Sequence, residues 1–313
     1  MKPFGRDAAL AVLQGGVATV ALFLAYLSLP LVGVAGGVLT PFPALFCSLK
    51  YGRGCGLAVA GVAGAALLAY SPGGAAVYLI QGAVLSLALA EAFRRGDGAG
   101  RAIFAATVSS TVVACAGLVL ASVAAGSGLH RLVVAAIDSI IRQSIEVYRS
   151  TGLKPEELRS LEQGLQQTGE LLSQIYPSLL ILFLALVAAT NALLAVKLAG
   201  RLPNVPIRGP FAGFRNRDHL VWMLIAAGFS LLVPATGVRF VALNLLVVAL
   251  TLYFVQGLAI AAAMFQRHSV ARPWRFLFYL MIVVQPYVAV ALTALGLFDL
   301  WLDFRRPRNR ENL

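Results

Sequence analysis

Uncharged polar side chains inside long apolar segments are the residues of this sequence most able to do chemistry. An amide or hydroxyl group without a hydrogen-bond partner costs several kcal/mol in an apolar medium. Each such group must therefore contact protein, water or a ligand. Hydrogen bonding between helices is one interpretation, and a cavity for an uncharged or weakly charged small molecule is the other. On the second interpretation we predict four substrate-binding residues: Thr40, Tyr51, Gln81 and Asn191.

Thr40 lies in the most unusual segment of the chain. Pro41 and Pro43 remove two backbone donors and disfavour helix at the residue before each of them. A broken helix inside a membrane is tolerated only where protein or a cavity satisfies the freed backbone groups. Such breaks often line the binding sites of transporters. A structural kink explains the same pattern equally well.

The sequence contains none of the motifs typical of soluble enzymes. It has no GxxxxGK[ST] phosphate loop, no HExxH, no GxSxG and no CxxC. Its histidines and cysteines show no metal-ligand spacing: His130, His219, His268, Cys47, Cys55 and Cys115. We therefore predict no catalytic residue, no metal site, no cofactor and no enzyme activity. No charged side chain lies near the middle of an expected span, which disfavours a proton-coupled pump.

Composition places the polar side chains in membrane-spanning helices. Of 313 residues, 59% are hydrophobic and only 12% are charged, against about 25% charged in soluble domains. Because apolar stretches of about 20 residues span a bilayer, we predict an all-α polytopic integral membrane protein with about nine transmembrane helices. The expected spans are 8–28, 31–49, 54–70, 75–93, 102–125, 177–199, 218–234, 239–264 and 275–298. Eight is the alternative, because 218–234 is short and Pro286 interrupts the last segment.

The distribution of basic residues predicts the orientation. With the N-terminus inside, 15 of the 25 Lys and Arg lie in inner segments, 6 in outer segments and 4 in the tail. This excess of inner basic residues is the one that the positive-inside rule describes, and it explains the net charge of +12 without nucleic acid. Nine spans would place the four tail arginines outside, against the rule. They are Arg305, Arg306, Arg308 and Arg310.

The polar stretch 126–175 separates two groups of expected spans. Apolar residues recur at helical spacing from Leu129 to Tyr148, with charged residues on the other side. Pro155, followed by two glutamates, predicts the start of a second helix. We predict an extracytoplasmic amphipathic helical hairpin. It either rests on the lipid interface or acts as a lid or partner-docking surface.

Small residues recur every four positions at the start of the third expected span. They are Gly52, Gly56, Ala60 and Gly64. Such a ridge lets another helix approach closely, so we predict helix packing at these positions. The approaching helix belongs either to this chain or to a partner.

The run LPLVGVAGGVLTPFPALFCSLKYGRGCGLAVAGVAG, residues 29–64, combines a Gly/Pro-rich span, a KYG-type turn and a small-residue helix. It resembles the S components of energy-coupling-factor vitamin transporters. The whole chain, with the ending GLFDLWLDFRR at 296–306, more closely resembles the YybS-like bacterial membrane proteins of unknown function. The resemblance implies a bacterial cytoplasmic (inner) membrane protein with a cytoplasmic N-terminus. It also implies a separate transmembrane coupling subunit and ATPases, in agreement with the missing phosphate loop.

Two functions fit this organisation. The leading hypothesis is a membrane-embedded solute-binding or transport subunit for a small molecule. The alternative is a non-transporting scaffold for cell-envelope or morphogenesis partners, recruited by the hairpin and the tail. We expect four segments: S-component-like membrane helices in 1–125, the hairpin in 126–175, further membrane helices in 176–298 and a basic tail in 299–313. Asp299, Trp301, Asp303 and Arg305 are expected to form an interfacial group.

Overall fold

The computed structural model describes residues 6–29, 32–150, 154–202 and 211–304. Every regular element in these ranges is a helix, which confirms the all-α prediction. The chain forms two compact units. Unit 1 comprises Met1–Gly169 and Leu179–Arg208, and unit 2 comprises Glu170–Ser178 and Gly209–Leu313. The division of the chain into two groups of membrane helices, a hairpin and a tail stays a prediction.

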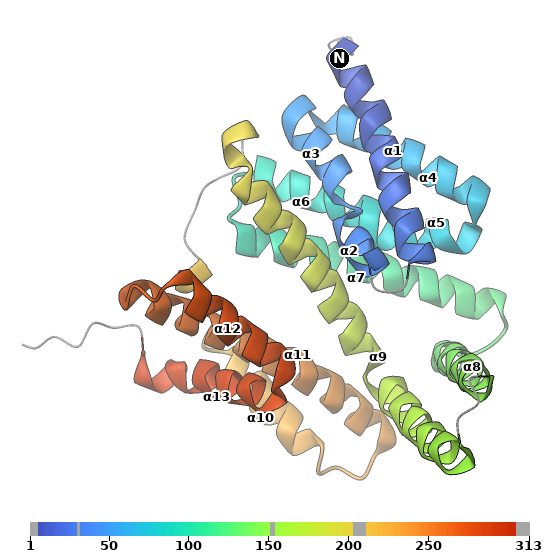
Figure 1. The fold of residues 1–313 in the computed structure, drawn as a ribbon, viewed down its shortest axis with the longest axis vertical. Coiled ribbons are helices and arrows are strands. Elements are labelled where there is room, and N and C mark those ends of the chain that lie inside the picture. Colours follow the sequence, from blue (N-terminus) through green and yellow to red (C-terminus); the bar gives the residue numbers. More distant parts are fainter. Residues whose placement is uncertain (1–5, 30–31, 151–153, 203–210, 305–313) are drawn as a thin grey trace, which may run out of the picture. The chain divides into compact units, whose positions relative to one another are not determined.

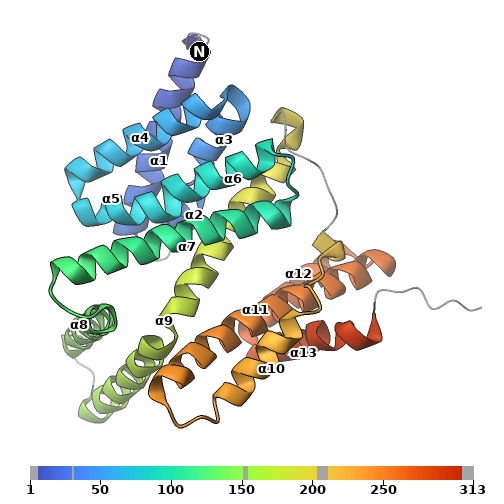
Figure 2. The same cartoon turned by 180° about the vertical axis from the view of Figure 1, so that it is seen from behind.

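Unit 1 contains the helices that carry the predicted binding residues (Figures 1 and 2). Its core lies between α3, α6, α7 and α9, where Leu45, Leu89 and Leu184 are at most 1% exposed. The elements are α1 (Arg6–Ser28), α2 (Val32–Leu39), α3 (Phe42–Tyr51), α4 (Arg53–Tyr70), α5 (Pro72–Tyr78), the π-helical segment η1 (Leu79–Val84), α6 (Leu85–Arg94), α7 (Ala99–Ala124), α8 (Leu129–Arg149), most of α9 (Pro155–Lys197) and the short 3₁₀ turn η2 (Ala199–Arg201).

Two glycines allow α2 to lie directly against α1. A Cβ added at Gly36 would lie 2.7 Å from the carbonyl oxygen of Leu22, and one at Gly37 would lie 2.6 Å from the ring of Tyr26. Any larger residue would therefore push the two helices apart. The Gly-rich start of the second span serves this close packing.

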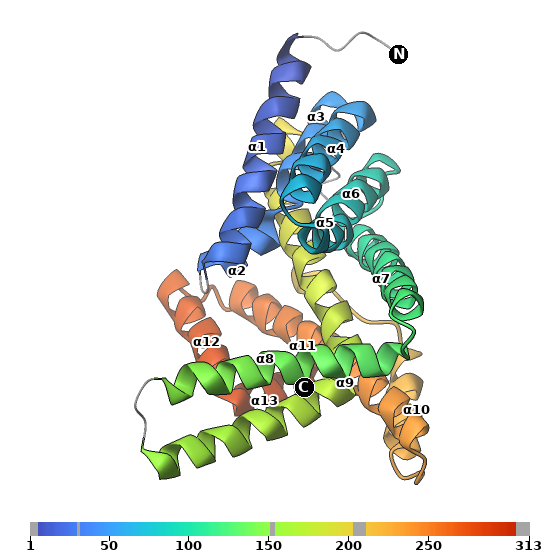
Figure 3. The same cartoon turned by 90° about the vertical axis from the view of Figure 1, so that its right-hand side faces the viewer.

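Helices α8 and α9 form the polar hairpin, which Figure 3 shows most clearly. As predicted, α9 has Pro155 in its first turn, and the backbone N–H of Lys154 donates to the carboxylate of Glu157 (3.4 Å). Arg149 links α8 to Glu162 of α9 across 2.8 Å. Because α9 runs without a break to Lys197, the second hairpin helix and the sixth span are one helix, and the boundary expected at 175/176 falls inside it.

Unit 2 is built around one long helix, α11. Its elements, besides residues of α9, are η3 (Phe211–Gly213), α10 (Leu220–Ser230), α11 (Thr236–Arg267), α12 (Arg272–Val284) and α13 (Pro286–Leu302). A Cβ at Gly257 of α11 would overlap the carbonyl of Leu292, and one at Gly296 of α13 would overlap the carbonyl of Tyr253. The backbones of α11 and α13 are therefore in direct contact.

In the described ranges, seven helices are long and apolar enough to cross a membrane. The pair α12 and α13 adds an eighth candidate, bent by 106° at Pro286, where the sequence predicts a break. This confirms a polytopic membrane protein. If α12 and α13 form one bent span, the described residues hold eight candidate spans. That number equals the alternative count from the sequence and is one below the preferred nine. The difference is the segment 218–234, whose helix α10 has 11 residues and rises only about 17 Å, against about 30 Å of hydrocarbon.

Candidate functional site

The break in the second span lies at Thr40 and Pro41, between α2 and α3. Thr40 is fully buried, and its hydroxyl donates to the carbonyl of Gly36 (2.9 Å). The side-chain amide of Asn191, on α9, donates to the carbonyl of Val38 (2.7 Å) and to Val187 on its own helix (2.7 Å). The exposed fraction of Asn191 is 0%. Two of the four predicted binding residues therefore satisfy the backbone groups at the break.

Gln81 lies beside this break. It belongs to the π-helical segment η1 and is 3% exposed. A Cβ on the adjacent Gly82 would lie 3.5 Å from the methyl group of Thr40, so η1 passes next to the break. Single π-helical turns inside α-helices occur frequently at functional sites. The π segment and the broken helix thus place Gln81 near Thr40.

Six buried side-chain polar atoms of unit 1 have no hydrogen-bond partner among the described residues. Two of them belong to predicted binding residues: the Nε2 of Gln81 and the Oδ1 of Asn191. One is a donor and the other an acceptor. Buried polar groups in native proteins are nearly always hydrogen-bonded, so each exception needs an explanation. A bound polar molecule or an ordered water would supply the missing partners. The side chain of Asn191 contacts Val38 at the break, and Gln81 precedes Gly82, whose added Cβ would lie 3.5 Å from Thr40.

Tyr51 is separated from the other three predicted residues. It ends α3, is 39% exposed, and has the ammonium group of Lys50 5.1 Å from its ring centroid. Ten residues of α3 lie between the break and this end, a rise of about 15 Å. The structure therefore brings Thr40, Gln81 and Asn191 together near the break. Tyr51 lies at the opposite end of α3.

The same end of α3 lies beside a cluster of charged side chains on α4 and α6. Glu91 accepts from Arg53 (2.6 Å) and from Arg95 (3.1 Å), which lies four residues further along the chain. Arg94 is mostly buried and donates to the carbonyl (2.9 Å) and hydroxyl (3.0 Å) of Ser48. This cluster fixes α6 to the last turn of α3.

The predicted small-residue ridge has three different surroundings. A Cβ at Gly56 would lie 2.5 Å from the Cβ of Ser48 on α3, so this position is tightly packed within the chain. Ala60 is 7% exposed, while a Cβ at Gly64 would make an ordinary contact with Tyr78 at 3.7 Å. Gly52 has φ +104°, a conformation that favours glycine, and forms the turn between α3 and α4.

Unit 2 holds a buried polar network that sequence reasoning missed. Asp299 is 1% exposed and accepts from the side-chain amide of Gln256 (3.0 Å) and from the backbone N–H of Phe304 (3.0 Å). The side-chain oxygen of Gln256 accepts from the backbone N–H of Asn216 (3.0 Å). Asp299 was expected at the membrane interface, but it lies inside α13 on the face toward α11. Its spacing of three residues from Gly296, which contacts α11, is the signal that could have placed it there.

The other three residues of the expected interfacial group do not form one cluster among the described residues. Trp301 is 63% exposed and Asp303 ends α13 in a left-handed conformation (φ 42°); Arg305 lies outside the described residues. No group of three or more His, Cys, Asp or Glu side chains that could hold a metal ion occurs in the described ranges.

Comparison with known proteins places the chain in a family. The family model described as "Predicted membrane protein (DUF2232)" matches residues 17–300. The chain belongs to the DUF2232 family. No curated protein and no solved structure matches it.

For this DUF2232 protein, the family description and the helices agree on a multi-pass membrane protein. Contact with a lipid bilayer follows from both. The relation to YybS-like proteins and to S components stays a prediction, as do the four binding residues.

Proposed function

We propose that this DUF2232 protein is a membrane-embedded solute-binding or transport subunit without an ATPase of its own. The observation that carries the proposal is the unpartnered side-chain amide of Gln81, buried on a π-helical turn beside a broken helix. A buried amide nitrogen without an acceptor is destabilising, and a polar ligand would remove that cost. The unpartnered oxygen of Asn191 next to the same break offers the complementary group.

The solute in this proposal is a small, uncharged or weakly charged molecule that both accepts and donates hydrogen bonds. Thr40, Gln81 and Asn191 are the residues that would contact it, and Tyr51 would lie at the cytoplasmic end of the same span. The protein would depend on a transmembrane coupling subunit and ATPases, and it would not be an enzyme. We place it in the bacterial cytoplasmic membrane with the N-terminus inside, because the inner segments hold most basic residues.

Native mass spectrometry on the tagged protein, gently extracted from its own membranes, tests this function. We expect a bound small molecule together with a coupling subunit and ATPases. The Gln81→Leu variant should lose the molecule, because leucine offers no donor. Gln14→Leu is the matched control, since Gln14 lies exposed on α1. A solute-free wild type, or a Gln81→Leu variant that keeps the molecule, would contradict the proposal.

A scaffold is the second candidate, favoured by one observation on α8. None of the residues of α8 is buried, and its apolar side chains Ile140 and Val147 are 63% and 64% exposed. In that case the protein would co-purify with cell-wall or shape-determining proteins and without solute. Ile140→Glu should then release those partners, while Arg142→Gln on the same helix should keep them.

A further inference from the structure

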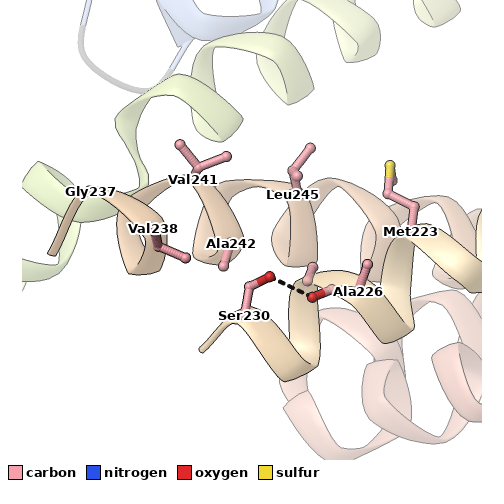
Figure 4. A pocket seen from close by; sticks show the side chains of 9 residues that line it. Met223, Ala226, Ser230, Gly237, Val238, Val241, Ala242 and Leu245 are labelled. Atoms are coloured by element: carbon pink, nitrogen blue, oxygen red, sulfur yellow. Dashed lines mark hydrogen bonds between the residues drawn. The ribbon is translucent and has the colours of Figure 1, made fainter. Parts of the chain in front are cut away.

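An apolar hollow of about 370 Å³ lies between α10 and α11 in unit 2 (Figure 4). Met223 and Ala226 line it from α10, and Val238 and Val241 line it from α11. Its only side-chain hydroxyl is that of Ser230, which donates to the carbonyl of Ala226 (2.7 Å), as the dashed line in Figure 4 shows. The hollow therefore presents hydrocarbon, and a hydrocarbon chain is the ligand that fits it.

A basic loop leads directly into the N-terminus of α10. Arg215, Arg217 and His219 are exposed and line a second, open hollow together with Asn216 and Asp218. Asp218 lies 3.7 Å from Arg215 and offsets part of its charge. Among the described residues, Arg217 takes part in none of the ion pairs. The loop thus offers a guanidinium group that is available to an anion.

This loop is held in place by the buried network of unit 2. The backbone N–H of Asn216 donates to Gln256 (3.0 Å), and its side-chain amide donates to the carbonyl of Leu252 (2.8 Å). Both acceptors belong to α11, which also lines the apolar hollow. The backbone that carries Arg215 and Arg217 is therefore held against α11.

The basic loop matches the headgroup of a phospholipid, and the apolar hollow matches one of its acyl chains. Helix α10 has 11 residues and rises about 17 Å, close to the roughly 15 Å of hydrocarbon in a single leaflet. Its N-terminus, next to the loop, carries the positive end of the helix dipole, which favours an anionic group. Basic pockets between transmembrane helices bind lipid headgroups by the same physics.

We propose that unit 2 binds one anionic phospholipid along α10. The headgroup phosphate contacts Arg217, Arg215 and His219, and one acyl chain occupies the hollow between α10 and α11. The residues involved belong to unit 2 alone, so the proposal stands or falls independently of the solute site.

Lipid titration of the purified full chain in a neutral detergent tests the headgroup contact. Bound lipid is counted by native mass spectrometry with phosphatidylglycerol and with phosphatidylcholine of the same acyl chains. We expect preference for phosphatidylglycerol, and about fivefold weaker binding of it by Arg217→Gln, since one basic side chain contributes about that factor. Arg131→Gln, exposed on α8 in unit 1, is the control and should bind as the wild type does. Equal binding by Arg217→Gln, or no preference between the two lipids, would overturn the proposal.

A second pair of variants tests the hollow. A Cβ at Gly237, which lines it, meets open space, and so does one at Gly228, which does not line it. Gly237→Leu should fill the hollow and abolish phosphatidylglycerol binding, while Gly228→Leu should keep it. If Gly237→Leu does not fold, judged by its melting temperature without lipid, the exposed Ala226→Leu fills the same space. Binding that survives a filled hollow, or glycerol phosphate binding as tightly as the intact lipid, would refute a lipid site.

Discussion

The side chain of Asn191 connects the broken second span to the rest of unit 1. Its amide donates both to Val38, in the last turn of α2, and to Val187 on its own helix. In an apolar surrounding, a backbone carbonyl that loses its helical donor needs a replacement. Asn191 provides it for Val38, and it keeps its own oxygen available for a ligand. One residue thus supports the break and contributes to the proposed site.

We predict that Asn191→Leu lowers the free energy of unfolding by about 1–3 kcal/mol, because it leaves the carbonyl of Val38 buried without a donor. The measurement is a thermal or denaturant melt of the purified protein in detergent. Thr190→Ala is the control: its hydroxyl donates within its own helix, to the carbonyl of Leu186. A melt of Asn191→Leu that matches the control would show that the break needs no such donor.

The sequence shows which polar residues need hydrogen-bond partners, but it does not show which of them lie together. Their presence in apolar segments shows that Thr40, Gln81 and Asn191 need partners, and the structure brings the three close to one break. Tyr51 does not belong to this group, because the length of α3 separates it from the break. Asp299 was missed because it follows the apolar run, whereas its helical position places it against Gln256.

At the scale of elements, glycines determine which helices come into contact. The sequence draws attention to the ridge from Gly52 to Gly64, yet among the described glycines an added Cβ would come nearest to another helix's backbone at Gly257 of α11 and Gly296 of α13. Gly257 and Gly296 lie far apart in the sequence, so no local spacing reveals that they face each other. Likewise, the continuity of α9 through Pro177 is hidden by the change from polar to apolar residues near 175.

We predict that Gly296→Ala disrupts unit 2 more than any other single methyl addition in α13. The new Cβ would overlap the carbonyl of Tyr253, and forced overpacking costs about 1–3 kcal/mol or more. Limited proteolysis and a detergent melt are the measurements. Gly228→Ala on α10, where a Cβ meets open space, should leave both unchanged. Unaltered proteolysis of Gly296→Ala would mean that α11 and α13 do not touch at this point.

At the scale of the whole molecule, charge governs how the helices enter the membrane. Arg94, Arg95 and Arg101 lie in and beside the turn between α6 and α7, whereas the turn between α4 and α5 has no basic residue. The hairpin of α8 and α9 is nearly neutral. The positive-inside rule counts basic residues in short loops, so the α6–α7 turn should lie on the cytoplasmic side and α8 on the other side. The number of helices and their packing do not determine the orientation, because both are the same for either one.

Cysteine labelling in intact cells decides the orientation. In a Cys115→Ala background, which removes the exposed native thiol and leaves the buried Cys47 and Cys55, a membrane-impermeant maleimide should label Ser139→Cys, on the exposed surface of α8. It should not label Gly98→Cys, in the α6–α7 turn, until the membrane is permeabilised. A Cβ added at Gly98 meets nothing within 4 Å, so poor labelling there reports sidedness and not burial. The reverse pattern would place the N-terminus outside and α8 on the cytoplasmic side.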